Sequence, residues 1–87
     1  MEKGSLLNDR LKAVRSQLRS MAPAVSIPYI QSFQLPEEEE LALIECDARG
    51  KSVVQFALSR NLSPETAKRR RRSALAKIAN CRQEALL

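Results

Sequence analysis

Apolar residues in the first 22 positions recur at the spacing of a single helix face. Along residues 5–21 they lie alternately four and three positions apart, which is the pattern of a helix that packs on another helix. The members of this apolar stripe are Leu7, Leu11, Val14, Leu18 and Met21. Ser5 is a suitable N-cap for such a helix. The stripe could pack within its own domain or form a homodimer interface. We predict the second use and treat residues 1–22 as a dimerisation element.

The next segment, residues 23–36, loses this periodicity. It contains no charged residue and has prolines at positions 23, 28 and 36. Because proline ends helices and disfavours helical backbone at the preceding residue, we expect an extended connector or arm here. Its apolar composition suits a covering arm, an edge strand or a subunit contact, and the sequence does not choose among them.

A second helix is predicted over residues 37–48. Four consecutive glutamates follow Pro36, and negative charge is favourable at a helix N-terminus. Gly50 is a suitable stop after this helix.

Two more helices are predicted in the C-terminal half, over residues 53–60 and 64–80. Ser52 and Ser63 stand where N-caps belong, and Asn61 tolerates the left-handed backbone of a tight turn. No pattern of a strand hairpin is present. The predicted fold is therefore all-α, a small bundle of about four helices, with residues 37–87 as its C-terminal domain.

Charge changes the picture of that last domain. The net charge of +5 conceals a partition, because residues 37–50 carry six anions and one cation, whereas residues 51–87 carry nine cations and two anions. Five cations follow one another from Lys68 to Arg72. A basic segment beside an acidic one indicates a single face directed at a polyanion.

The last predicted helix has an apolar and a cationic side at about 100° per residue. Arg71 falls on the apolar side, with Ala67, Ala74, Leu75 and Ile78. The opposite side is suited to a DNA groove, because Arg pairs with guanine edges and Lys neutralises phosphates. We predict DNA base contacts from Glu65, Lys68, Arg69 and Arg72. We predict DNA backbone contacts from Ser52, Ser63, Thr66, Arg70 and Lys77.

Residues between positions 35 and 78 have the spacing of a known helix–turn–helix skeleton. They are Leu35, Pro36, Glu39, Leu43, Gly50, Ser52, Phe56, Ala57, Leu62, Ser63, Thr66, Lys68, Arg69, Arg72, Ala74, Leu75, Ala76, Lys77 and Ile78. On these residues the segment resembles region 4 of bacterial sigma factors and, more loosely, DNA-binding domains of the LuxR (GerE) type. The sigma spacing fits without a gap, whereas the LuxR spacing needs one residue removed before Gly50. The resemblance implies a helical domain that recognises a promoter-like or operator site in the major groove.

Two arginines depart from the pattern of that family. Arg60 stands where a Leu is usual, and Arg71 stands where an aliphatic residue faces the core. Because an unpaired buried guanidinium is costly, these side chains must reach the surface or pair with acids. We expect Arg71 to contact an acidic residue of the helix over residues 37–48. The candidates are Glu37, Glu38, Glu39, Glu40 and Glu45.

The leading hypothesis is a sequence-specific, double-stranded DNA-binding transcription regulator, a small repressor or activator that inserts the helix 64–80 in the major groove. We expect a cytoplasmic homodimer. The alternative is an adaptor that binds RNA polymerase or another regulator through the acidic helix or the apolar stripe.

Other classes of function have little support in the sequence. The chain has no His and no Gly-rich phosphate loop, so we do not expect an enzyme or a cofactor. Cys46 and Cys81 lack the spacing of metal ligands, and we expect both to be reduced. No apolar run approaches 18 residues, so we expect no membrane span.

Overall fold

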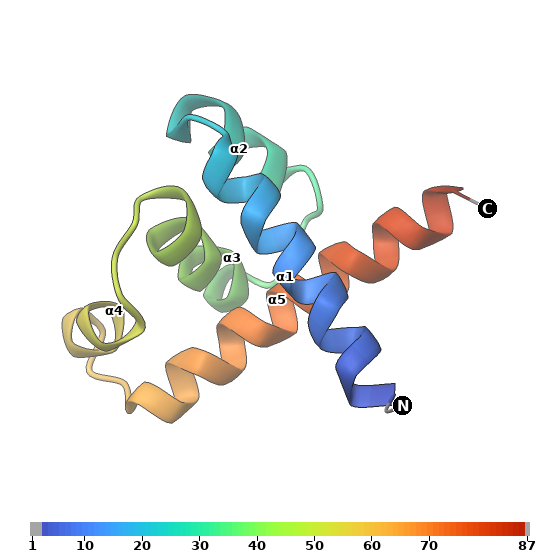
Figure 1. Ribbon diagram of the computed structural model, residues 1–87. Helices are drawn as coiled ribbons and strands as arrows, with labels where there is room; N and C mark the ends of the chain where they lie inside the picture. The colour runs from blue at the N-terminus through green and yellow to red at the C-terminus, as the bar shows by residue number, and fades with distance from the viewer. Residues whose placement is uncertain (1–2, 87) are drawn as a thin grey trace.

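The computed structural model of the chain describes the backbone of residues 3–86 and the side chains of residues 8–81 (Figure 1). The elements in chain order are α1 (Lys3–Ser20), α2 (Pro23–Gln31), α3 (Glu37–Leu43), a π-helical segment η1 (Ile44–Ala48), α4 (Val53–Ser59) and α5 (Pro64–Leu86). No strand occurs in this part of the chain, which confirms the all-α prediction. There are five α-helices within residues 3–86 rather than about four.

The additional helix is α2, in the segment that we expected to be extended, so that prediction was wrong. Pro23 occupies the first turn of α2, where a missing N–H removes no helical hydrogen bond. Pro28 lies inside the helix and does lack one backbone donor. The helix nevertheless forms because it packs on η1 and α3, with Ser26 and Ile30 completely buried. Tertiary burial therefore overrides the local preference of proline.

The predicted helix over residues 37–48 changes its pitch midway. It is α-helical to Leu43 and π-helical from Ile44, and the Arg49 N–H donates to the Ile44 carbonyl at 2.9 Å across five residues. Such wider turns are rare and often lie at functional positions. Within η1, the side chains of Ile44, Cys46 and Asp47 are all buried. Gly50 follows with a φ of +82°, a backbone conformation that suits glycine.

The predicted starts of the last two helices are confirmed. Ser52 caps α4, with the Gln55 N–H donating to its Oγ at 3.0 Å and the Gln55 side chain accepting from its N–H at 3.1 Å. Asn61 has the left-handed backbone expected of it, with a φ of 58°. Ser63 caps α5, because its Oγ accepts from the Thr66 N–H at 3.1 Å. The two serines thus define where each helix begins.

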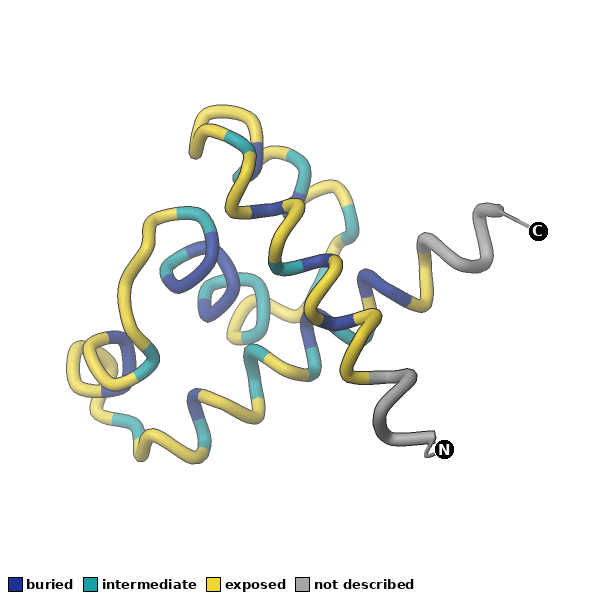
Figure 2. Tube along the Cα trace, in the orientation of Figure 1, coloured by how far each residue is buried: buried dark blue, intermediate teal, exposed yellow. Residues whose placement is uncertain are grey.

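Two hydrophobic clusters meet on α5, which extends past the predicted end near residue 80. Figure 2 shows buried and exposed residues alternating along this helix. The larger cluster joins α1, α2, α3, η1 and the middle of α5. The smaller one lies between α3, η1, α4 and the first part of α5, and its buried members are Ala42, Cys46, Phe56, Ala57 and Ala67. The first part of α5 therefore packs in the smaller cluster and its middle packs in the larger one.

The apolar stripe of α1 belongs to the larger cluster. Within a single chain, Leu11 is 5% exposed, Val14 3% and Leu18 0%. Met21 is half-buried on the same cluster, and the Leu7 side chain lies outside the described residues. Leu11, Val14 and Leu18 are therefore used by the chain's own core and offer little surface to a second copy in this fold. For these three residues the structure shows packing within the domain, and a dimer contact through Leu7 or Met21 stays a prediction.

Candidate nucleic-acid interface

The first half of α5 and the helix before it form one packed unit. α4 contacts α5 through Phe56 and Ala57, which lie with Ala67 in the smaller cluster. Residues 60–63 connect the two helices. In Figure 1 the N-terminal part of α5 runs along the lower edge of the molecule with α4 beside its start. One side of this stretch of α5 therefore faces outward.

That outward side carries the residues predicted to contact bases. Glu65, Lys68, Arg69 and Arg72 are all exposed. The inner side is apolar as expected, because Ala67, Ala74, Leu75 and Ile78 are all buried. Among residues 8–81, the structure pairs neither Lys68 nor Arg69 with a carboxylate. Positive charge is thus presented to solvent on a helix that is anchored by its other face.

Arg70 and Lys77, predicted to contact the DNA backbone, lie against acidic side chains. Arg70 Nη2 is 3.4 Å from Glu38 Oε1, and Lys77 Nζ is 2.9 Å from Glu39 Oε1. Ser73 Oγ donates to Glu39 Oε2 at 3.0 Å. The acidic start of α3 therefore binds one flank of α5 and balances part of its charge. Backbone contacts from Arg70 and Lys77 stay a prediction.

The predicted backbone contacts from hydroxyl groups lie at the starts of α4 and α5. Ser52 and Ser63 are exposed caps, and Ser63 Oγ also donates to Thr66 Oγ1 at 2.9 Å. Their main structural role is to satisfy backbone N–H groups at the two helix starts. The starts themselves are exposed, where N–H groups and hydroxyls suit a phosphate.

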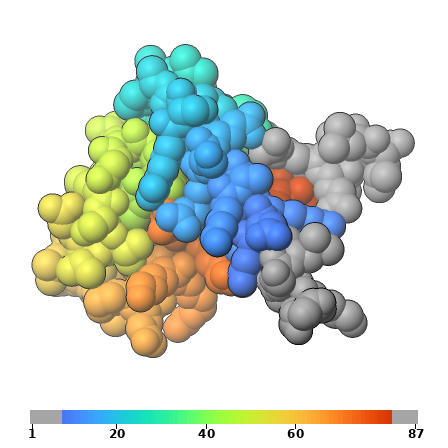
Figure 3. All heavy atoms as spheres, in the orientation of Figure 1, coloured from blue at the N-terminus to red at the C-terminus, as the bar shows by residue number. Residues whose placement is uncertain are grey.

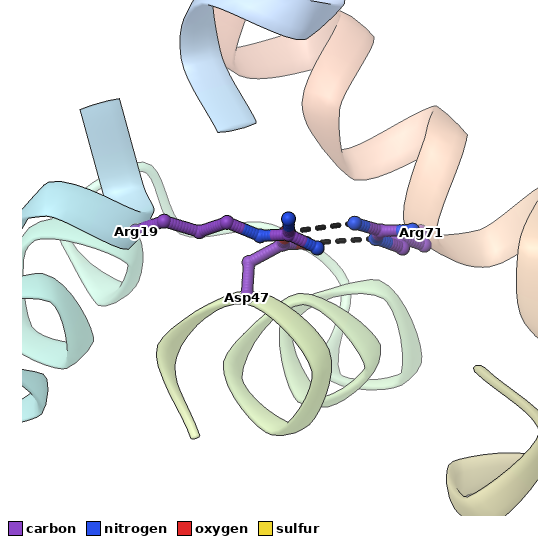
Figure 4. A network of polar contacts seen from close by, with 3 residues as sticks. All are labelled: Arg19, Asp47 and Arg71. Atoms are coloured by element: carbon purple, nitrogen blue, oxygen red, sulfur yellow. Dashed lines mark hydrogen bonds and ion pairs between the residues drawn. The ribbon is translucent and has the colours of Figure 1, made fainter. Parts of the chain in front are cut away.

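Arg71 forms a bidentate ion pair with Asp47 of η1 (Figure 4). Arg71 Nε donates to Asp47 Oδ2 at 2.8 Å and Nη2 donates to Oδ1 at 2.7 Å. The Asp47 side chain is completely buried and that of Arg71 is 15% exposed. Hydrogen bonding to Asp47 raises the pKa of the Arg71 guanidinium, although burial acts in the opposite direction. Arg19 Nε approaches Asp47 Oδ1 from the other side at 3.6 Å.

This pair confirms that Arg71 contacts an acidic residue of the predicted helix 37–48. The partner, however, is none of the five glutamates named as candidates. Asp47 is buried in the π-helical turn that changes the pitch after Leu43, four residues beyond the buried Leu43 itself. The sequence carried no signal for that change of pitch.

Arg60 follows the other route expected for a charged residue at an apolar position. It is exposed at the C-terminal end of α4, where its side chain reaches the surface. There it lines a shallow hollow shared with Glu37, Glu38 and Arg70. The two departures from the helix–turn–helix pattern thus have two different physical solutions.

Sequence reasoning missed the cations of α1 that face α5. Lys12 and Arg15 line a cleft between these helices together with Lys68 and Arg72. Lys12 directly follows the buried Leu11, and Arg15 directly follows the buried Val14. That adjacency places them at the edge of the packed face and is the signal that could have found them.

Within the described residues, no three His, Cys, Asp or Glu side chains gather as metal ligands. No helix in that part of the chain combines the length and apolar character needed to cross a bilayer. Comparison of the chain with known protein families, with curated proteins and with solved structures finds no match.

Proposed function

We propose that this chain is a sequence-specific, double-stranded DNA-binding transcription regulator. The observation that carries the proposal is the outward side of α5, where Lys68, Arg69 and Arg72 are exposed on a helix whose inner face is buried. A helix of this kind can enter the major groove while the rest of the domain holds its position. In this proposal α4, the turn over residues 60–63 and α5 are a helix–turn–helix.

The local structure supports that assignment in two ways. The connection between α4 and α5 is four residues long and passes through left-handed backbone at Asn61, as a tight helix–helix turn requires. The capped starts of α4 and α5 are exposed to solvent, so phosphates can approach their N–H groups. The resemblance of residues 35–78 to sigma region 4 supports the same reading.

A homodimer is part of the proposal, because paired helix–turn–helix units read half-sites about 34 Å apart in successive major grooves. Leu11, Val14 and Leu18 of the α1 stripe are buried in the chain's own core and so contribute little to that contact. We therefore assign the dimer no interface. A palindromic DNA preference would support the dimer without defining its interface.

Selection of bound duplexes from a random pool tests the function directly. We expect one sequence to be enriched and to bind at least about a thousandfold more tightly than scrambled DNA. Affinity should fall linearly on a plot of log affinity against log salt concentration, because each neutralised phosphate releases counterions. Enrichment of no sequence would reject sequence-specific recognition.

The adaptor alternative rests on the acidic start of α3. Two of its four glutamates, Glu38 and Glu39, already contact α5, so less of that surface is free for a partner. Charge reversal by Arg69→Glu and Arg72→Glu separates the two functions. Loss of regulation together with DNA affinity supports the DNA-binding regulator, whereas regulation that persists after DNA affinity is lost supports the adaptor.

A further inference from the structure

A cleft of about 370 Å³ lies between α1 and the first half of α5. Its lining residues are Asn8, Leu11, Lys12, Arg15, Lys68, Arg71, Arg72 and Leu75. In Figure 3 the atoms of α1 and of the first half of α5 adjoin on the face turned to the viewer. The cleft therefore borders the outward side of α5 but draws half of its walls from a helix outside the proposed helix–turn–helix.

The walls of this cleft are strongly cationic. Five of the eight lining residues are Lys or Arg and none is acidic. Asp47 balances Arg71, but it lies behind the cleft and its carboxylate is completely buried. Among residues 8–81, the one side-chain partner of Arg72 is Asn8, whose Oδ1 accepts a hydrogen bond of 3.3 Å from Arg72 Nη2. Like charges held this closely repel one another, so a bound anion would relieve an unfavourable interaction.

Arg15 provides a second, independent observation. Its Nε atom is buried and has no hydrogen-bond partner among the described residues. A buried donor without an acceptor is costly and is rare in native structures. The pKa of the Arg15 guanidinium is lowered, first by burial and then by repulsion from Arg71 and Arg19. The charge and the donor of Arg15 thus both favour an anionic acceptor.

We propose that the cleft between α1 and α5 binds a phosphate group. Lys12, Lys68 and Arg72 are exposed and supply charge at the rim, while Arg15 offers a donor below them. Leu11 and Leu75 form an apolar floor that cannot compete for the phosphate oxygens. A phosphate group carries more charge and more acceptor oxygens than a carboxylate, so it satisfies more of these cations at once.

The phosphate could belong to a DNA backbone or to a free oligophosphate, since both present the same oxygens. The site requires only the cleft and does not depend on sequence-specific DNA recognition. If the ligand is DNA, α1 becomes part of the interface. If it is free oligophosphate, the cleft is a ligand site that shares Lys68 and Arg72 with the recognition surface.

The first test is calorimetric titration of the full chain with sodium pyrophosphate at low, constant ionic strength. We expect saturable binding with one pyrophosphate per chain. The double variant Lys12→Gln/Lys68→Gln should bind on the order of tenfold or more weakly, because it removes one charge-assisted contact from each wall. Both residues are exposed, so the variant should keep its fold.

The matched control is Arg10→Gln/Arg69→Gln. It also removes one exposed cation from α1 and one from α5, but neither residue lines the cleft. Its pyrophosphate affinity should stay within about threefold of the parent chain, since only long-range charge is lost. Equal losses in the two double variants, or no saturable binding by the parent chain, would overturn the proposal.

A second arm identifies the source of the phosphate. Lys12 lines the cleft but is not among the residues proposed to contact DNA, so the affinity of Lys12→Gln for a fluorescent duplex, measured by anisotropy, separates the two sources. Duplex binding weaker than that of the control Arg10→Gln supports a backbone phosphate in the cleft. Duplex affinity equal to that of Arg10→Gln, together with weaker pyrophosphate binding, supports a free oligophosphate. Absence of DNA binding would reject the proposed function and leave the calorimetric test of the cleft intact.

Discussion

Arg71 and Arg72 are adjacent in α5 but have opposite surroundings. Arg71 turns inward, is 15% exposed and makes two hydrogen bonds to the buried carboxylate of Asp47. Arg72 turns outward, is exposed and donates a hydrogen bond of 3.3 Å to Asn8, its one side-chain partner in the described part of the chain. One step of about 100° along the helix separates the two positions.

This difference shows that the run from Lys68 to Arg72 serves two physical purposes. The inner arginine has a fixed partner and contributes to the arrangement of α5 on η1. Within the described residues, no carboxylate pairs with the outer cations Lys68, Arg69 and Arg72, and their charge is available for a ligand. A count of cations could not have separated the inner residue from the outer ones, because arginine occurs on both sides of the helix.

Replacing Arg71, the inward-facing arginine, should have the largest effect on stability. Arg71→Met leaves the Asp47 carboxylate buried, with only Arg19 at 3.6 Å nearby. We expect a loss of about 3–5 kcal/mol in the free energy of unfolding, measured by urea denaturation. Arg72→Met is the control and should change stability by less than about 0.5 kcal/mol. Similar losses of unfolding free energy in the two variants would contradict the difference between the inner and outer sides of α5.

The same pair allows a rescue experiment. Arg71→Met combined with Asp47→Leu removes both charges and leaves apolar side chains of similar volume. Replacing a buried ion pair in this way is often neutral, so the double variant should recover most of the stability that Arg71→Met loses. A double variant no more stable than Arg71→Met would show that the loss does not come from the uncompensated carboxylate.

Loss of a buried side chain between α1 and α5 should have the next largest effect on the free energy of unfolding. Leu18 is completely buried, and Leu18→Ala should cost about 3 kcal/mol through lost contacts and a residual cavity. Leu58→Ala is a suitable control, because Leu58 is 74% exposed and its loss should cost less than about 0.5 kcal/mol. Denaturant unfolding measures both. An equally small loss at Leu18 would contradict the placement of the α1 stripe in the core.

The start of α5 should show a smaller effect. Ser63→Ala removes the oxygen that accepts the Thr66 N–H, at a cost of about 1 kcal/mol. Ser16→Ala, at an exposed position inside α1, should be neutral or slightly stabilising, because Ala is the better helix former. Thermal unfolding of the two variants compares them. A neutral Ser63→Ala would indicate that the cap contributes nothing to α5.

The features predicted correctly from the sequence are those determined by neighbouring residues. Ser52, Ser63 and Asn61 act through hydrogen bonds or backbone angles within a few positions, so their roles could be inferred directly. The inner and outer faces of α5 followed from helical periodicity alone. These local rules located the proposed interface.

The features that were missed depend on contacts distant in sequence. Pro28 favours an extended chain locally, and only packing on η1 and α3 makes α2 a helix. Asp47 and Arg71 meet across 24 residues of sequence. The cationic cleft needs α1 to lie on α5, although Lys12 and Lys68 are remote in the chain. Neither propensity nor charge pattern contains that information.

The central claim is that the outward cations of α5 read DNA while Arg71 does not. The most direct measurement is the affinity of Arg69→Gln/Arg72→Gln for the selected duplex and for a scrambled one, at one salt concentration. Arg49→Gln is the control, because Arg49 is an exposed cation that pairs with Glu45 away from α5. We predict that the double variant unfolds like the parent chain. Each lost base contact should lower the preference for the selected sequence by about 1–3 kcal/mol. An unchanged preference, with affinity for both duplexes no lower than that of Arg49→Gln, would contradict the claim.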